Sequence, residues 1–319
     1  MNTTDNTNKI RNIHNIHTVL GAGPVAKATV TALLARGLPV CVVHRSGTFP
    51  KQTGLEVVAA DITDVAQLTQ AFTGSAVVYM CAMPAYHRWV DKFEAMMTNV
   101  LQACATTGSA MVFADNLYMY QESPNAPLTE TTPPQPATSK GVVRARVAEM
   151  VLQANWDGKV KTAIARASDF FGPGVDNAML GNRFFPPLIA GKTVQWFGNL
   201  DMPHSFTYVP DFGKALAELG VDGKGWGEVW HVPSSVTCSA TEVANATAAL
   251  THKPAKLKGG GRLMLRIVGL FIPAAKEMIE MLPHFETPYI VDNSKWHSRM
   301  HTRATPWNAA LAETVFSYE

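Results

Sequence analysis

Residues 18–48 read TVLGAGPVAKATVTALLARGLPVCVVHRSGT, a stretch in which an apolar run, a glycine turn, a segment of helical period and a second apolar run follow one another. Gly21 and Gly23 are spaced G-x-G, and Ala26 takes the third position of the pattern. In such a unit the first glycine allows a tight turn, the second lets the backbone approach a pyrophosphate, and the small third residue lets the helix pack on the strand. The pyrophosphate then sits at the helix N-terminus, where N–H groups point outward. The pattern predicts a dinucleotide-binding turn formed by Gly21, Gly23, Pro24 and Val25.

The end of the second apolar run carries the signal for cofactor preference. An acidic residue there would hold the ribose 2′-hydroxyl of NAD, but this chain has His44, Arg45 and Ser46. A guanidinium fork and a hydroxyl suit a 2′-phosphate. We therefore expect NADP in preference to NAD. Further cofactor contacts are expected after the third and fourth strands, at Asp61, Ile62, Cys81 and Ala82.

The first half of the chain alternates between short apolar runs and longer segments of helical period, which predicts parallel strands with helices on both faces. One helical face is marked by Val90, Phe93, Met97, Val100, Leu101 and Cys104. The fold class expected is α/β, a doubly wound Rossmann sheet with a smaller C-terminal substrate lobe. The expected strands are Thr18–Leu20, Val40–His44, Leu55–Ala59, Ala76–Met80, Ala110–Ala114 and Val160–Ala165.

The domain organisation expected has three parts. Residues 1–16 are polar and Asn-rich, and we predict a disordered lead-in without a signal peptide. Residues 17–175 would form the dinucleotide-binding domain. Residues 176–319 would form mainly a substrate-binding lobe, with segments that return to the Rossmann sheet.

Composition excludes several functional classes. A formal net charge of +2 gives no reason to expect a nucleic-acid partner. The four cysteines form no CxxC and indicate reduced thiols in a cytoplasmic protein. The apolar segment 263–282 contains Arg266, Pro273 and Lys276, so we expect buried or amphipathic helices and not a membrane span. His297 and His301 lack a glutamate beside the first histidine, and no metal is expected.

Two later segments carry a resemblance to a known family. Residues 166–174, RASDFFGPG, are similar to an Arg-x-x-Asn-Val-Tyr-Gly-Pro-Gly segment. Residues 191–216 are similar to a second segment, Gly-x-Pro-x-x-x-x-Gly…Tyr-Val-Asp-Asp, and retain its Tyr208, Val209 and Asp211. With the glycine turn, these segments resemble the short-chain dehydrogenase/reductase superfamily in its extended, NAD-dependent epimerase/dehydratase branch. The resemblance extends from Thr18 to about Leu250. It implies a Rossmann sheet, a nicotinamide cofactor and a small C-terminal lobe.

The chain departs from the family pattern at the residues that would carry catalysis. Leu20 replaces the first glycine of G-x-x-G-x-x-G, and Asn116 falls at the catalytic serine position. The family's Tyr-x-x-x-Lys is missing from residues 137–150, the stretch in which the expected helix opens. If Lys140 is the family lysine, Pro136 replaces the tyrosine; if Lys140-Gly141 replaces Tyr-Gly, Arg144 replaces the lysine, and we prefer this second register. The chain is therefore identified as an atypical member.

The resemblance then suggests roles for individual side chains. Lys140 can polarise a carbonyl, Asn116 can donate a hydrogen bond to a substrate oxygen, and Tyr118 and Tyr120 are alternative acids. The catalytic candidates are Lys140, Asn116 and Tyr120. The cofactor candidates added here are Arg144, Ala167 and Ser168, and the substrate candidates are Tyr86, Trp89, Tyr118, Phe171 and His204.

The expected substrate is a small, largely apolar carbonyl or hydroxyl metabolite. His204 lies where many nucleotide-sugar relatives carry an arginine that binds phosphate, and its loss argues against such a substrate. An apolar pocket, or alternatively plain core, is expected from Phe171, Phe184, Phe185, Trp196 and Phe206.

Two functions follow from this combination of features. The first is an NAD(P)-dependent oxidoreductase or epimerase with a remodelled proton-transfer site. The second is a non-catalytic NAD(P)-sensing regulatory protein, which the missing Tyr-x-x-x-Lys motivates.

Because relatives often dimerise through a four-helix interface, we also expect a homodimer formed by the helices at Arg88–Thr107 and Ser139–Trp156.

Overall fold

A computed structural model describes residues 15–121, 126–261, 265 and 279–319. The lead-in expected at residues 1–16 lies outside the described residues except for Asn15 and Ile16, and most of the apolar segment 263–282 also lies outside them. No described helix is both long enough and apolar enough to cross a bilayer. The described chain forms two compact units: the first runs to Ala114 and adds Val147–Ile164 and Leu216–Glu228, and the second comprises Asp115–Arg146, Ala165–Ala215 and the chain from Val229 onward.

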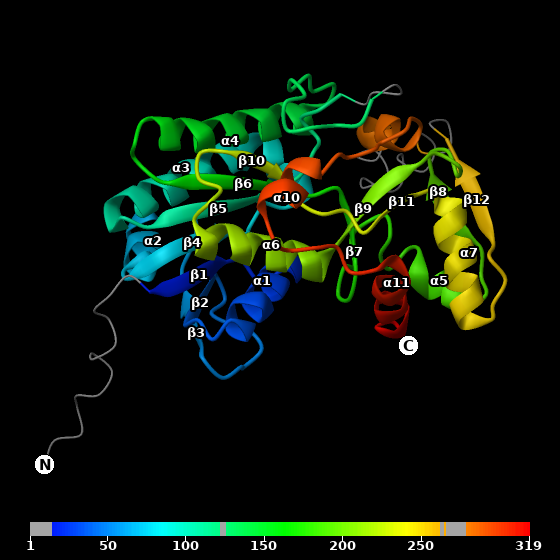
Figure 1. The fold of residues 1–319 in the computed structure, drawn as a ribbon, viewed down its shortest axis with the longest axis horizontal. Coiled ribbons are helices and arrows are strands. Elements are labelled where there is room, and N and C mark those ends of the chain that lie inside the picture. Colours follow the sequence, from blue (N-terminus) through cyan, green and yellow to red (C-terminus); the bar gives the residue numbers. More distant parts are fainter. Residues whose placement is uncertain (1–14, 122–125, 262–264, 266–278) are drawn as a thin grey trace, which may run out of the picture. The chain divides into compact units, whose positions relative to one another are not determined.

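The main sheet has seven strands in the order β10-β6-β5-β4-β1-β2-β3 within the described residues (Figure 1). The neighbouring strands from β3 through β2, β1 and β4 to β5 pair in parallel, which requires crossover connections. The order reverses between β1 and β4, which is the switch point at which doubly wound sheets bind ligands. The strands are β1 (Ile16–Leu20), β2 (Val40–His44), β3 (Leu55–Ala59), β4 (Ser75–Met80), β5 (Ala110–Asp115), β6 (Thr162–Arg166) and β10 (Val229–His231).

The expected strands agree closely with this sheet and confirm the α/β Rossmann class. The strands β2 and β3 have the predicted bounds, and β1 begins two residues earlier than predicted. Central strands are buried along most of their length because helices cover both faces.

Helices accompany the strands of the first unit, where α1 packs on β1 and β2, and α2 packs on α3 (Figure 1). One expected position is wrong: Val90, assigned to the buried face, is 58% exposed. Trp89 takes the buried place at the start of that helix, and Phe93, Met97 and Val100 continue the face. The helices are α1 (Pro24–Ala35), α2 (Val65–Phe72), α3 (Trp89–Thr107), which the 3-10 turn η1 (Tyr86–Arg88) precedes, and α4 (Ser139–Trp156), whose last turns belong to this unit.

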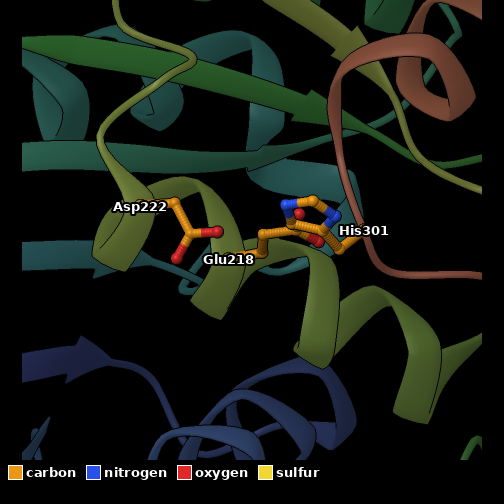
Figure 2. A group of neighbouring side chains, drawn as sticks. All are labelled: Glu218, Asp222 and His301. Carbon is orange, nitrogen blue, oxygen red and sulfur yellow. The ribbon is translucent and has the colours of Figure 1, made fainter.

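The last turns of α6 (Val209–Asp222) also belong to the first unit. A Cβ at Gly220 would clash with the hydroxyl oxygen of Tyr79, so the glycine lets this helix approach the sheet. Tyr79 in turn hydrogen-bonds Nδ1 of His17 at 2.8 Å. Figure 2 shows Glu218 and Asp222 one turn apart on this helix, and Asp222 pairs with Arg36 at 3.4 Å.

The second unit contains two smaller sheets. β11 pairs antiparallel with β9, β9 pairs parallel with β7, and β12 pairs parallel with β8. α5 packs on α7, and α11 also packs on α7 (Figure 1). The elements are β7 (Asp169–Phe171), α5 (Phe185–Ile189), β8 (Val194–Phe197), β9 (His204–Tyr208), β11 (Val236–Cys238), α7 (Ala240–Thr251), β12 (Leu257–Gly260), η2 (Leu282–Phe285), α10 (Ser294–Arg299) and α11 (Trp307–Phe316).

An aromatic core holds these smaller elements together. The five aromatic residues expected to line a pocket or a core all belong to it and are nearly or fully buried. Phe184 packs edge-to-face on Trp196, and Phe171 lies between Tyr208 and Trp307. The geometry favours the core interpretation of Phe171, Phe184, Phe185, Trp196 and Phe206.

A buried ion cluster ties the end of β5 to α4 and the end of β6. Nη1 of Arg144 lies 3.0 Å from Oδ1 of Asp115, and Nε of Arg166 lies 3.1 Å from Oδ2. All three side chains are at most 5% exposed. Nη1 of Arg166 also donates to the hydroxyl of Tyr120 at 2.5 Å. One carboxylate therefore compensates two buried guanidinium groups.

We predict that Asp115→Asn destabilises the protein strongly, because both arginines lose their shared anion. Removal of one partner of a buried ion pair costs about 3–5 kcal/mol. Guanidinium unfolding curves of parent and variant measure the loss. The control is Asp222→Asn, whose pair with Arg36 is partly exposed and should contribute less than about 1 kcal/mol. Equal losses for the two variants would contradict the prediction.

Candidate functional site

The turn between β1 and α1 has the backbone that the glycine pattern predicts. Gly21 has φ +124°, and a Cβ there would lie 3.1 Å from the backbone nitrogen of Ala82. Gly23 has φ −74° and precedes α1, and no atom lies within 4 Å of the place where its Cβ would be. Gly21 is therefore required by the fold, whereas the open position at Gly23 is not used by the protein itself.

The N-terminus of α1 fits an anion. It has Pro24 in its first turn, no acidic residue there, and no side chain that caps its N–H groups. The first N–H groups of a helix lack partners within it, and the helix dipole favours negative charge at that end. These features fit the phosphates of a dinucleotide at Gly23.

The residues after β2 form a short polar turn. Nδ1 of His44 lies 2.9 Å from Oγ of Ser46, which in turn lies 2.5 Å from Oγ1 of Thr48. The side chain of Arg45 is exposed. The turn thus presents one guanidinium and no carboxylate at the carboxyl end of the strand.

The other expected cofactor residues of the first unit have defined local roles. Oδ1 of Asp61 accepts hydrogen bonds from the backbone and hydroxyl of Thr63, both at 2.8 Å, and the backbone bond is the main reason why the pKa of Asp61 is lowered. The carbonyl of Ile62 accepts a bond from Asn99 at 3.0 Å. Burial raises the pKa of the Cys81 thiol to about 12, so the thiol is neutral.

In the second unit, Lys140 is held by a carboxylate. Its Nζ lies 3.0 Å from Oε2 of Glu280, while Oε1 accepts a 2.7 Å bond from the hydroxyl of Ser139. Burial alone would raise the pKa of Glu280, but the bonds from Ser139 and Lys140 hold it below its usual value. Lys140 therefore belongs to an ion pair at the start of α4.

The two candidates Arg144 and Tyr120 lie in the buried ion cluster of Asp115. Tyr120 is 1% exposed, and its hydroxyl lies 3.3 Å from Nε2 of His231. Burial raises the pKa of Tyr120, although Arg166 opposes the shift. Burial also lowers the pKa of His231 to about 3, which keeps that ring neutral. The cluster is a structural anchor, and the catalytic role of Tyr120 and the ribose contact of Arg144 stay predictions.

A second polar chain links Tyr118, Asp169 and His204. The Tyr118 hydroxyl donates to Oδ1 of Asp169 at 3.1 Å, and Nε2 of His204 lies 2.8 Å from Oδ2. Burial alone would raise the pKa of Asp169, but the hydrogen bond and charge of His204, with smaller contributions from His284 and Tyr118, hold it below its usual value. Asp169 therefore remains a carboxylate.

The local structure fixes each member of this chain. Asp169 opens β7, which pairs with β9, and His204 opens β9. The His204 ring stacks on Phe285 at 5.0 Å and on Tyr289 at 4.9 Å. These two rings prevent rotation of the imidazole, so Nε2 stays directed at the carboxylate.

Asn116 and the start of α4 hold Tyr118. Oδ1 of Asn116 accepts a hydrogen bond from the backbone N–H of Tyr118 at 3.2 Å, which stabilises a turn after β5. A Cβ at Gly141 would clash with the carbonyl oxygen of Tyr118, so glycine is needed there. The tyrosine side chain is only partly buried, unlike Tyr120.

The remaining candidates are placed as follows. Ala167 donates its N–H to the carbonyl of Asp115 at 3.2 Å, and the hydroxyl of Ser168 pairs with that of Thr207 at 2.8 Å. In the first unit, Tyr86 packs edge-to-face on Trp89, with ring centroids 5.0 Å apart, and Trp89 is buried. The cofactor and substrate roles of these residues stay predictions.

Sequence reasoning missed Asp169 and Glu280. Asp169 stands at the asparagine position of the quoted 166–174 segment, so its signal was present as a departure from the pattern. Glu280 carried no signal, because it lies 140 residues from the lysine that it pairs with.

A curated relative supports the resemblance over part of the chain. The sequence is 25% identical over 196 residues to 3beta-hydroxysteroid-dehydrogenase/decarboxylase isoform 2 of Arabidopsis thaliana, an alignment of 56% of this chain and 34% of the relative. The chain thus spans about a third of the length of that relative.

Solved structures share the fold along nearly the whole chain. An epimerase of Methanothermobacter thermautotrophicus gives a TM-score of 0.80 at 18% identity, covering 96% of this chain and 92% of that one. UDP-glucose 4-epimerase of Thermus thermophilus, in complex with NAD, gives 0.77 at 19%, covering 95% and 98%. dTDP-glucose 4,6-dehydratase of Streptomyces venezuelae, with NAD and TYD bound, gives 0.76 at 17%, covering 95% and 96%.

A family model also matches residues 18–223, which is more than half of the chain. The matched residues include the glycine turn, Asp115 with its two arginines, and the chain of Tyr118, Asp169 and His204. The protein therefore belongs to the NAD dependent epimerase/dehydratase family.

Proposed function

We propose that this protein is an NAD(P)-dependent oxidoreductase or epimerase that acts on a small, largely apolar carbonyl or hydroxyl metabolite. The observation that carries the proposal is the open N-terminus of α1 beside Gly23 in a chain of this family. When bound, the nicotinamide ring supplies the hydride donor or acceptor.

The proposed cofactor is NADP, with NAD as the alternative. The two solved relatives described with a cofactor contain NAD, which supports the nicotinamide class. The exposed guanidinium of Arg45 and the absence of a carboxylate from 44–46 favour a 2′-phosphate.

Tyr118 is the proposed group that moves a proton at the substrate oxygen. Of the two tyrosines that follow β5, Tyr118 is a partly exposed residue, whereas the hydroxyl of Tyr120 contacts Arg166 and His231 in the interior. Lys140 forms an ion pair with Glu280, so we do not assign the proton transfer to Lys140. Positioned acid–base groups contribute roughly 10²–10⁴-fold to rate.

An apolar substrate without phosphate is supported by two observations. His204, at the position of the phosphate-binding arginine in many nucleotide-sugar relatives, is directed at Asp169 and stacked between two rings. The curated relative is named for a hydroxysteroid, an apolar alcohol.

A non-catalytic NAD(P) sensor is the second candidate. It is favoured by the ion pairs of Lys140 with Glu280 and of Arg144 with Asp115, which engage both side chains that the preferred register places at the family's tyrosine and lysine. Calorimetry with the four nicotinamide forms, followed by cofactor absorbance with a panel of apolar ketones and alcohols, separates the two. Binding with turnover supports the enzyme, binding without turnover supports the sensor, and no binding overturns both.

We also propose a homodimer in the cytoplasm. Val90 on α3 and Trp156 on α4 are 58% and 64% exposed, and both lie on the two helices expected to form the interface. Light scattering of the parent and of Trp156→Glu tests this, since a monomeric parent would contradict it.

We predict that Gly23→Asp abolishes dinucleotide binding without loss of stability. The backbone of Gly23 is in an ordinary region and its Cβ position is empty, and Asp is a favourable residue before a helix. The carboxylate would repel the diphosphate, and we expect affinity for NADP to fall by about 100-fold or more, which corresponds to about 2.7 kcal/mol. Calorimetry measures binding and thermal unfolding measures stability. Retained affinity would contradict the site.

We predict that Arg45→Gln changes cofactor preference. The variant removes the guanidinium that would meet a 2′-phosphate, so affinity for NADP should fall about 10- to 100-fold, in line with about 1.5–3 kcal/mol for a charged hydrogen bond, while affinity for NAD changes little. Dissociation constants for both cofactors test this. An equal fall for NAD and NADP would show that Arg45 does not read the phosphate.

A further inference from the structure

The chain of Tyr118, Asp169 and His204 has an internal direction. The phenol is the donor to Oδ1 of Asp169, because a carboxylate can only accept. His204 is a donor to Oδ2 through Nε2–H, while its Nδ1 is buried and has no hydrogen-bond partner among the described residues. The carboxylate thus receives two donors, one on each oxygen.

The surroundings of the chain are aromatic. His284 stacks on the Tyr118 ring with centroids 5.4 Å apart, and Phe206, Phe285 and Tyr289 surround His204. His284 and His204 are the titratable groups that act on Asp169 together with Tyr118. In such surroundings the side chains have little freedom to reorient, so the hydroxyl proton of Tyr118 stays directed at Asp169.

We infer that Asp169 and His204 are positioning residues for Tyr118, which hold its hydroxyl proton on the side of the carboxylate. This inference rests on the proposed function. It gives the chain a Tyr–Asp–His arrangement in place of the family's Tyr-x-x-x-Lys pair.

The arrangement defines the proton path of alcohol oxidation. The substrate hydroxyl would give its proton to the phenolic oxygen as the phenolic proton passes to Oδ1 of Asp169. A bound oxidised nicotinamide would supply the acceptor for the C–H hydride. The alcohol becomes a carbonyl, Tyr118 ends neutral, and Asp169 carries the proton until water takes it. Carbonyl reduction follows the same path in reverse.

The test is the ionisation of Tyr118, followed by phenolate absorbance or by fluorotyrosine NMR, with Tyr118→Phe to assign the signal. It needs neither cofactor nor substrate. Asp169→Asn removes the anion that stabilises the neutral phenol, so the pKa of Tyr118 should fall by about 1–2 units. His204→Phe keeps the ring stack but removes the donor to Asp169, so the phenol meets a less compensated carboxylate and its pKa should rise by about 0.5–1 unit.

Matched variants separate positioning from packing. His204→Gln offers an amide donor without the charge, and should move the pKa of Tyr118 from the His204→Phe value back toward that of the parent despite the lost stack. Tyr318→Phe removes a phenol that bonds the carbonyl of Val175 at 3.0 Å and should leave the Tyr118 signal unchanged. A role in packing alone would move Asp169→Asn and His204→Phe in the same direction, together with their melting temperatures.

Opposite pKa shifts for the two variants support the inference, and no shift or shifts of one sign overturn it. With a substrate from the ketone and alcohol panel, Asp169→Asn and His204→Phe should lower kcat by about 10- to 100-fold with a smaller effect on KM and a displaced pH profile, as loss of acid–base efficiency predicts. Parent-like kcat in both variants would also overturn it. Absence of turnover by the parent would instead refute the proposed enzyme, while the Tyr118 titration would still decide the arrangement.

Discussion

The carboxylate of Asp115 between two buried guanidinium groups is the interaction on which the polar core of the second unit depends. It joins the end of β5 to α4 through Arg144 and to the end of β6 through Arg166. This anion offsets much of the cost of burying the two guanidinium groups. The same cluster draws in Tyr120 through Arg166. Two residues that the family resemblance offers for the site, Arg144 as a cofactor contact and Tyr120 as a catalytic acid, thus take part in holding the strand ends together.

Because the Asp115 cluster includes Tyr120 but not Tyr118, these two tyrosines have different surroundings. Tyr120 faces a cation and a neutral imidazole in a closed interior, and burial raises its pKa. Tyr118 follows the Asn116 turn, and its hydroxyl reaches Asp169. Close approach of α4 at Gly141 fixes the backbone of Tyr118. A partly exposed phenol whose proton is held by a fixed carboxylate is the better candidate for exchange with a substrate.

Local patterns in the sequence predicted the Rossmann half of the fold well, because buried parallel strands read as short apolar runs and a glycine turn has few backbone solutions. The bounds of β2, β3 and α4 agree with the prediction. Val90 was assigned wrongly because helical period alone does not say which residue begins the buried face, and Trp89, one position earlier, takes that place. The partners of the site were beyond such reasoning: Glu280 meets Lys140 from 140 residues away, and Asp169 meets His204 across two strands of a small sheet. Those contacts depend on tertiary packing, which spacing does not encode.

Asp169 and His204 both differ from the residues that the family pattern has at their positions, and this difference bears on the kind of substrate that the protein binds. The family segment quoted above has asparagine where this chain has Asp169, and many nucleotide-sugar relatives have arginine where it has His204. An amide and a cation suit a phosphate, whereas a carboxylate repels one and engages the only donor that His204 directs toward it. Asp169 without His204 would be a poorly compensated carboxylate, and His204 without Asp169 would lose the partner that orients it. The two changes therefore support each other, and they are part of the reason why we propose a substrate without a diphosphate.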